Sequence, residues 1–348
     1  MPKLNPLSRR PKSLKLAWQA LVSDHVIALE WSPDRSLLAA AAVSGQICLF
    51  HAKDGGLVKA WQGHGFGVTS VSWHPTNPSL LASSGQDGKV AIWDTSTRET
   101  EPIRTFTAGT SWVTKTQWSP DGQYLAAAAG KLLRIWDASG KLVREYPEHL
   151  STVSDIQWGP KNLDIASSCY SRLQVWTPDS DKPKQSFEWK GSILKLVWSP
   201  DGSYIATGDQ DSTVHFWIIK TGDDLMMSGF AYKVRELSWD NTSRFLATGG
   251  GEVPCVWDCA GKGPAGTTPK QLQAHEDKVT VLTYQNRGKY LASGGFDGLV
   301  ALWQPQSRQT PVANLHTQSA ISQLCWNGDD SLLAAGTDSG QVLVIRPA

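Results

Sequence analysis

Aromatic residues recur along this 348-residue chain at a nearly constant spacing, and that spacing limits what the chain can fold into. Eight short apolar segments each end in an aromatic anchor: Trp31, Trp73, Trp118, Trp158, Trp198, Trp239, Tyr284 and Trp326. Neighbouring anchors are 40 to 45 residues apart. A second series follows the anchors by 18 to 20 residues: Phe50, Trp93, Trp136, Trp176, Trp217, Trp257, Trp303 and Ile345. Two series that keep one phase indicate a repeat architecture.

Each repeat reads as a set of short β-strands. In the second repeat, the segment VTSVSW ends at the anchor Trp73 and is followed by Pro75, which ends a strand. An apolar run (LLASS), a Gly-containing turn (QDGK), a third strand (VAIW) and a weaker fourth strand (RTF) follow. No segment of 10–12 residues shows a convincing helical period. Four strands per repeat predict the blade of a β-propeller.

Two dipeptides recur at fixed places in these repeats. WD occurs at 93–94, 136–137 and 257–258, and GH occurs at 63–64 with a near match at 274–275. The chain therefore resembles the WD-repeat β-propeller family over residues 14–346. The resemblance and the repeat count together predict an all-β fold: a single closed eight-bladed propeller of four-stranded antiparallel blades. We expect the blades at about 21–62, 64–107, 110–146, 150–189, 191–230, 232–273, 276–315, and 318–346 with 14–20.

The two ends of the chain suggest how the ring closes. The last repeat stops after its third strand, and the segment before the first repeat (SLKLAWQ) matches the fourth-strand pattern LVKAWQ. We expect residues 14–20 to pair beside residues 341–345 and remove two open sheet edges. Residues 1–13 form a basic arm. This arm is either simply solvated or a weak tether for an acidic partner or anionic lipid.

Two repeats carry Ser, His and Asp at matching positions, which invites a nucleophilic interpretation. The residues are His64, Ser83, Asp87 and Trp93, and then His275, Ser293, Asp297 and Trp303. The resemblance implies a structural hydrogen-bond network in each repeat instead. Other repeats depart from this pattern: the fourth has His149 but Tyr170 in place of Asp, and the fifth has Trp189 where His is expected.

The resemblance also selects candidate partner-binding residues on the top face, which carries the fourth-to-first and second-to-third strand loops. These are Trp112, Thr114, Lys233, Arg235, Lys278 and Phe296. An exposed aromatic side chain beside several cations is typical of an interface and would suit an acidic peptide with an apolar anchor. Alternatively, the aromatic residues pack on neighbouring loops and the cations are merely solvated.

Composition argues against several other classes of protein. A net charge of +1 makes nucleic acid an unlikely partner, although the arm and the lysines leave that option open. No apolar run approaches the length of a transmembrane helix. The odd number of cysteines, five, favours free thiols and a cytoplasmic location. No His or Cys spacing predicts a metal site, but Cys169, Cys255 and His residues could still converge across blades.

We therefore expect a non-catalytic scaffold, without a cofactor, that binds partner proteins or peptides through its top face. This expectation rests on fold analogy, because propellers also host enzymes. The alternative is a propeller that binds a small molecule or metal ion, or acts as an enzyme, in its central channel. A charged or oxygen-rich channel lining would favour the alternative, and small apolar side chains would favour the scaffold.

Overall fold

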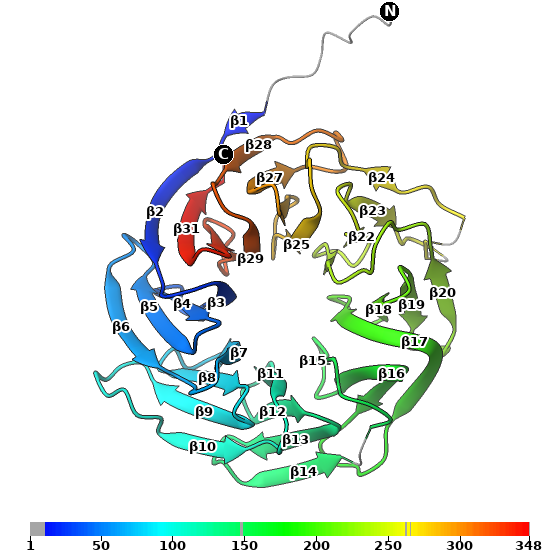
Figure 1. The fold of residues 1–348 in the computed structure, drawn as a ribbon. Coiled ribbons are helices and arrows are strands. Elements are labelled where there is room, and N and C mark those ends of the chain that lie inside the picture. The colour runs from blue at the N-terminus through cyan, green and yellow to red at the C-terminus, as the bar shows by residue number, and fades with distance from the viewer. Residues whose placement is uncertain (1–10, 147–148, 262, 265, 348) are drawn as a thin grey trace, which may run out of the picture.

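A computed structural model describes residues 11–146, 149–261, 263–264 and 266–347. Within those ranges the chain forms 31 β-strands and no helix. The strands form sheets arranged around a central channel, and successive sheets follow one another around the ring (Figure 1).

Five of the sheets have four strands each. The first consists of β3 (Val26–Trp31), β4 (Leu37–Ala42), β5 (Gln46–His51) and β6 (Leu57–Gln62). The second consists of β7 (Val68–Trp73), β8 (Leu80–Gly85), β9 (Lys89–Asp94) and β10 (Arg104–Thr107). The third is β11 (Val113–Trp118), β12 (Tyr124–Ala129), β13 (Leu132–Asp137) and β14 (Leu142–Tyr146). Another consists of β21 (Leu237–Trp239), β22 (Phe245–Thr248), β23 (Cys255–Asp258) and β24 (Lys270–Gln271). The last of the five joins the two ends of the chain, in the order β2 (Lys15–Leu21), β31 (Gln341–Arg346), β30 (Leu333–Thr337) and β29 (Ile321–Trp326).

The remaining two sheets depart from four strands. One has five strands: β1 (Lys12–Ser13), β28 (Ala313–His316), β27 (Leu299–Trp303), β26 (Leu291–Gly295) and β25 (Val279–Tyr284). The other has six: β15 (Asp155–Trp158), β16 (Ile165–Trp176), β17 (Gln185–Trp198), β18 (Tyr204–Asp209), β19 (Val214–Ile218) and β20 (Asp224–Met227).

The six-stranded sheet corrects the predicted number of blades. The first part of β17 pairs with β16, and its second part, from Ile193, pairs with β18. The chain thus passes from the fourth repeat to the fifth without leaving the sheet, because residues 185–198 stay extended and contain no proline. The prediction of eight four-stranded blades is therefore wrong. Counted by hydrogen-bonded sheets, the propeller has seven blades, and the fourth and fifth repeats share one of them.

A tight turn at Ser171 also lengthens β16. Ser171 has a φ of 66°, in the left-handed region that the Gly-containing turns of other repeats occupy. At this turn the structure keeps the chain in strand geometry from Ile165 to Trp176. In the second repeat the strand instead ends at the corresponding turn, which contains Gly88 between β8 and β9.

The predicted closure by the N-terminal strand is confirmed. Strand β2 pairs antiparallel with β31, from Lys15 opposite Arg346 to Leu21 opposite Gln341. The buried Trp18 of β2 donates a hydrogen bond from Nε1 to the Ala52 carbonyl at 2.8 Å. Its upstream neighbour β1 pairs in parallel with β28 of the adjacent sheet. The N-terminal segment therefore connects three consecutive sheets.

The core lies between neighbouring sheets, and the aromatic repeats fill it. Aromatic side chains on fourth strands pack against third-strand tryptophans of the next repeat. The ring centroids are 5.3 Å apart for Trp61 and Trp93, 5.2 Å for Phe106 and Trp136, and 5.2 Å for Phe187 and Trp217. Apolar burial at about 25 cal/mol per Å² makes these contacts the main source of stability.

The anchor tryptophans connect first strands to one another. In five of the seven anchor tryptophans, the indole Nε1 donates to a backbone carbonyl on the first strand of the preceding repeat. The pairs are Trp31 with Cys325, Trp73 with Glu30, Trp158 with Gln117, Trp198 with Gln157 and Trp326 with Thr283, at 3.0–3.2 Å. The period of the anchors therefore reflects one contact that recurs around the channel.

Candidate functional site

The Ser-His-Asp residues of the second repeat lie in one buried network. The Trp93 indole donates to Ser83 Oγ at 2.8 Å, and His64 Nε2 lies 2.8 Å from the same oxygen. Asp87 accepts from His64 Nδ1 at 3.0 Å. Burial lowers the pKa of His64, although Asp87 counteracts this, so the ring is neutral at pH 7. Ser83 is fully buried, so no substrate could reach its hydroxyl.

The seventh repeat contains the same network. His275 Nε2 lies 2.7 Å from Ser293 Oγ, which also accepts from the Trp303 indole at 2.8 Å. Asp297 completes it at 3.1 Å from His275 Nδ1. Both networks tie a loop to the middle of a blade and give each buried polar group a partner.

The fourth repeat replaces the missing Asp with backbone. His149 Nδ1 donates to the Lys131 carbonyl at 2.9 Å, while His149 Nε2 and the Trp176 indole both reach Ser167 Oγ at 2.9 Å. Tyr170 stands where the Asp is expected and is exposed.

The fifth repeat contains a different polar group. Trp217 donates to Thr207 at 3.2 Å, and the fully buried Asp209 lies near it with no His between them. Burial, together with the nearby Asp211, raises the pKa of Asp209 to about 8. Its Oδ1 has no hydrogen-bond partner among the described residues.

We expect Asp209→Asn to stabilise the protein increasingly as the pH rises. Between about pH 4 and pH 8 the folded carboxyl keeps a proton that the unfolded chain has lost, so wild-type stability falls with pH across this window. The amide cannot ionise, so the variant should gain at least about 2 kcal/mol more in free energy of unfolding at pH 9 than at pH 5. Urea denaturation at both pH values measures the difference. The exposed Asp223→Asn on the same sheet is the control, and a pH-independent effect of D209N would contradict the prediction.

The top face is defined by two kinds of loop that lie side by side. In several repeats a backbone N–H of the second-to-third strand turn donates to a carbonyl in the loop before the first strand, as in Val43 to His25 at 2.9 Å and Gln86 to Gly67 at 3.0 Å. The Phe296 N–H likewise donates to the Lys278 carbonyl at 2.9 Å.

Three of the six predicted partner-binding residues gather on this face. Phe296 is 55 % exposed, and Lys278 beside it places its ammonium 5.9 Å from the ring of Tyr232. Tyr232 is 57 % exposed and precedes the exposed Lys233. We call Tyr232, Lys233, Lys278 and Phe296 the aromatic–lysine patch. Tyr232 was not predicted from the sequence, although an aromatic residue directly before Lys233 could have indicated it.

Trp112 and Thr114 lie elsewhere on the ring. Trp112 is 63 % exposed and lines a cavity of about 650 Å³ together with Val43, Gln86 and Thr152. Thr114 donates its hydroxyl to the Val153 carbonyl at 2.9 Å, so that donor is used within the ring. The six residues thus do not form one surface.

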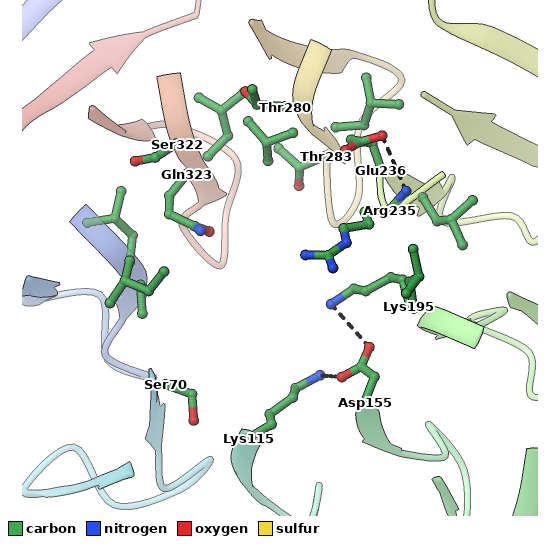
Figure 2. Close-up of a pocket in the computed structure, with 18 of the residues that line it drawn as sticks. Ser70, Lys115, Asp155, Lys195, Arg235, Glu236, Thr280, Thr283, Ser322 and Gln323 are labelled. Carbon is green, nitrogen blue, oxygen red and sulfur yellow. Dashed lines mark hydrogen bonds and ion pairs between the residues drawn. The ribbon is translucent and has the colours of Figure 1, made fainter. Parts of the chain in front are cut away.

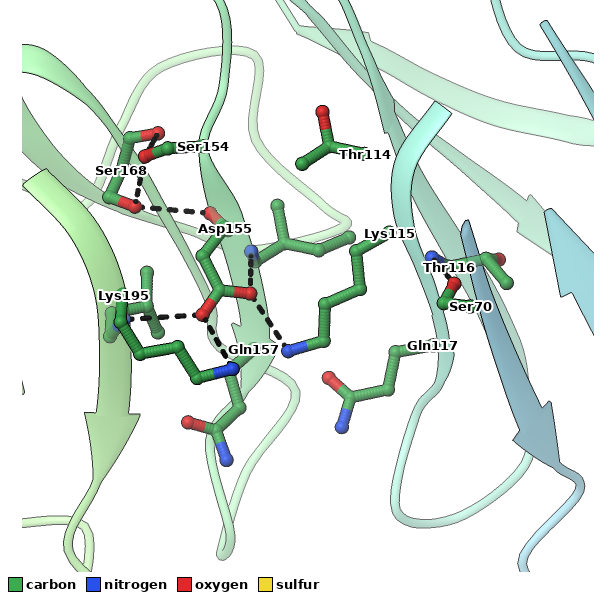
Figure 3. A network of polar contacts seen from close by, with 12 residues as sticks. Ser70, Thr114, Lys115, Thr116, Gln117, Ser154, Asp155, Gln157, Ser168 and Lys195 are labelled. Atoms are coloured by element: carbon green, nitrogen blue, oxygen red, sulfur yellow. Dashed lines mark hydrogen bonds and ion pairs between the residues drawn. The ribbon is translucent and has the colours of Figure 1, made fainter. Parts of the chain in front are cut away.

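Arg235, the sixth residue, lines the central channel, a cavity of about 650 Å³. Figure 2 shows its guanidinium pointing into the channel near Lys195, with Lys115 and Asp155 on the adjoining strands. Asp155 lies 2.9 Å from Lys115 Nζ and 3.3 Å from Lys195 Nζ, and it accepts the Leu196 N–H at 3.2 Å (Figure 3). Lys115, Asp155 and Lys195 were not predicted from the sequence.

A regular signal could have found the channel residues. Lys115, Asp155 and Lys195 each stand three residues before an anchor tryptophan. The same position in other repeats is Ala28, Ser70, Glu236, Val281 and Gln323, and all of these also line the channel. The lining is charged around one side of the channel and small, apolar or uncharged around the other.

Ionisation in the channel follows from burial and pairing. Burial alone would raise the pKa of Asp155, but the ammonium groups of Lys115 and Lys195 lower it overall. Burial lowers the pKa of Lys115, and Asp155 opposes that shift. Burial raises the pKa of Glu30, whose nearby cation is Lys115, to about 8. At pH 7 Asp155 is therefore ionised and Glu30 is mostly neutral.

Comparison with known families matches most of these repeats. The family described as WD domain, G-beta repeat, matches residues 55–94, 100–137, 181–217, 266–304 and 309–345, more than half of the chain. This chain belongs to the WD-repeat family. Residues 9–74 also match the WD40 domain of anaphase-promoting complex subunit 4.

Each of three curated relatives matches about a third of the WD-repeat chain. Activating molecule in BECN1-regulated autophagy protein 1A of Danio rerio is 33 % identical over 113 residues, 32 % of this chain and 8 % of that protein. Histone-binding protein MSI1 of Saccharomyces cerevisiae is 31 % identical over 115 residues, 31 % of this chain and 27 % of that protein. Protein transport protein sec13 of Emericella nidulans is 29 % identical over 133 residues, 32 % of this chain and 43 % of that protein. Each alignment spans less than half of the relative.

The crystal structure of the computationally designed Ika8 protein has the same fold as this WD-repeat chain. The TM-score is 0.81 at 20 % identity, over 95 % of this chain and 99 % of that chain. At that identity the match concerns the fold alone.

Two further properties bear on what the WD repeats could bind. Within the described ranges, no three His, Cys, Asp or Glu side chains are grouped to hold a metal ion. The same ranges form no helix of the length and hydropathy that crossing a membrane requires.

Proposed function

We propose that this WD-repeat protein is a non-catalytic interaction scaffold that binds a partner protein through its top face. The aromatic–lysine patch carries the proposal. Two aromatic rings, each more than half exposed, lie beside lysines on loops held together by backbone hydrogen bonds. Neighbouring exposed aromatic side chains are typical of interaction sites, and aromatic residues are enriched among those that supply most of the binding energy in interfaces.

The charge of the patch suggests the character of the partner. Lys233 and Lys278 would attract acidic residues and speed association, while Phe296 and Tyr232 would bury an apolar side chain. An acidic segment with an apolar anchor therefore suits the patch. One relative carries histone binding in its name, which supports a general role in protein recognition. A cytoplasmic location is part of the proposal and is supported by five free cysteines.

The test is affinity capture with the full chain and two matched triple variants. The top-face variant is Lys233→Glu, Lys278→Glu and Phe296→Ala. The control carries Lys53→Glu, Lys141→Glu and Leu57→Ala at exposed third-to-fourth strand positions, which lie on the opposite face. We expect quantitative mass spectrometry to show a partner depleted at least about tenfold with the top-face variant and retained with the control. An identical set of partners for all three proteins would refute this use of the patch.

The channel lining favours a second candidate function, the binding of a small molecule in the central channel. A charged lining was the feature expected of that alternative, and Lys115, Asp155, Lys195 and Arg235 provide it on four consecutive repeats.

A further inference from the structure

Three cationic side chains converge on one side of the channel. Lys115 comes from β11, Lys195 from β17, and Arg235 from the segment just before β21. All three line the same cavity, and Figure 2 shows their charged ends on the same side of the channel, with Asp155 between Lys115 and Lys195. We call Lys115, Lys195 and Arg235 the channel cations.

Asp155 holds two of these cations in place. It is 3 % exposed, and its two carboxylate oxygens contact Lys115 and Lys195 at 2.9 and 3.3 Å. The lysine side chains remain 25 % and 38 % exposed. Asp155 thus fixes both ammonium groups while leaving part of each accessible from the channel. Fixed, accessible donors bind an anion with little additional loss of side-chain entropy.

Arg235 supplies donors that the protein does not use. Among the residues that the structure describes, no carboxylate forms an ion pair with its guanidinium. The adjacent Glu236 carboxylate instead accepts the backbone N–H of Gly250 at 3.2 Å. A guanidinium with free N–H groups favours bidentate contact with an oxyanion.

The charges of this cluster do not cancel. Three channel cations lie beside the ionised Asp155. Burial raises the pKa of Glu30 to about 8, so this carboxyl offsets little of the cationic charge at pH 7. Glu236 also lines the channel; burial raises its pKa, and its nearby cation is Lys278. Like charges held together in a partly buried channel repel one another and favour a bound anion.

We infer that the channel cations form a binding site for a phosphate group. A phosphate or phosphate monoester carries nearly two negative charges at pH 7 and three strong acceptor oxygens. Its negative charge is complementary to the channel cations, and its oxygens can accept hydrogen bonds from all three. Ser70 and Gln323 on other first strands add polar groups to the lining. This inference rests on the second candidate function and not on partner binding.

The cavity is large enough for more than one phosphate group. It has a volume of about 650 Å³, within the range of small-molecule sites. The Trp112 cavity shares Ile27, Thr69 and Thr114 with it, so the two adjoin at the top face. Either a free phosphate compound or a phosphate borne on a larger ligand could therefore approach from the top face.

The test is a calorimetric titration of the full chain with pyrophosphate and with O-phosphoserine, at constant ionic strength in chloride. Pyrophosphate represents a free anion, and O-phosphoserine represents a phosphate ester. We expect at least one of them to bind with a Kd below about 1 mM. We expect Arg235→Gln to weaken binding at least tenfold, and Arg235→Lys to weaken it less. The ligand that binds more tightly identifies the source of the phosphate.

Lys220→Gln is the control, because Lys220 is an exposed cation that does not line the channel. Its affinity should equal that of the wild type. Absence of binding to both ligands in the folded wild type would overturn the inference, as would equal weakening by K220Q and R235Q. Circular dichroism confirms that the variants fold. The partner-capture result above does not depend on Arg235, so the two proposals can fail separately.

Discussion

We expect deletion of residues 1–20 to lower the free energy of unfolding by more than about 5 kcal/mol. The deletion removes β1 and nearly all of β2, which pairs with β31 along its length. It also removes Trp18, which is 7 % exposed and packs on Phe50. The cost combines a lost aromatic side chain with two newly opened sheet edges.

Thermal unfolding measures this effect as a fall in Tm of more than about 10 °C, or as loss of a single cooperative transition. Trp18→Ala should reproduce a large part of it. Leu21→Ala on the same strand should have little effect, because Leu21 is 70 % exposed. An unchanged Tm after the deletion would show that the ring does not depend on closure by β2.

We expect Ser83→Ala to lower the free energy of unfolding by about 2–4 kcal/mol. The Ser83 hydroxyl lies 2.8 Å from both His64 Nε2 and the Trp93 indole nitrogen, and it is fully buried. Alanine would leave two buried polar groups without a partner, and neither can reach water. Ser293→Ala should behave in the same way in the seventh repeat, where the distances are 2.7 and 2.8 Å.

Loss of the Asp in either network should lower the free energy of unfolding by less than loss of the Ser. The side chains of Asp87 and Asp297 are 17 % and 12 % exposed, so water can partly replace them. We expect Asp87→Ala and Asp297→Ala to cost about 1–2 kcal/mol in urea denaturation and to leave partner capture unchanged. The exposed Ser96→Ala is a neutral control on the second repeat. Loss of partner binding in a fully folded Asp87→Ala protein would contradict a purely structural role.

Periodicity predicted the fold class because each aromatic position repeats one physical contact. Anchor tryptophans donate to the neighbouring first strand, and fourth-strand aromatics pack on the next repeat. The prediction of separate blades failed at residues 185–198. The repeat pattern indicates which residues are buried, but it does not predict whether the chain bends between two strands.

The candidate site was predicted less well. Lys278 and Phe296 do meet on the top face, since their backbone hydrogen bond belongs to a loop pairing that recurs in several repeats. Arg235 was assigned to the same face but lines the channel, where Lys115 and Lys195 had not been selected. Residues four and three positions before the anchor both line the channel in several repeats, such as Arg235 and Lys115, and only the first of these positions was used to select candidates.

By itself, the sequence determined the repeat, the all-β propeller and the closure by the N-terminal strand. Each of these depends on apolar residues that recur in one phase, and burial of apolar surface is readable from such a pattern. The tertiary structure alone decided that Lys115, Asp155, Lys195 and Arg235 meet, although they are about 40 residues apart from one to the next. Their charges interact only after the ring closes, because electrostatic pairing depends on distance in space and not on order along the chain.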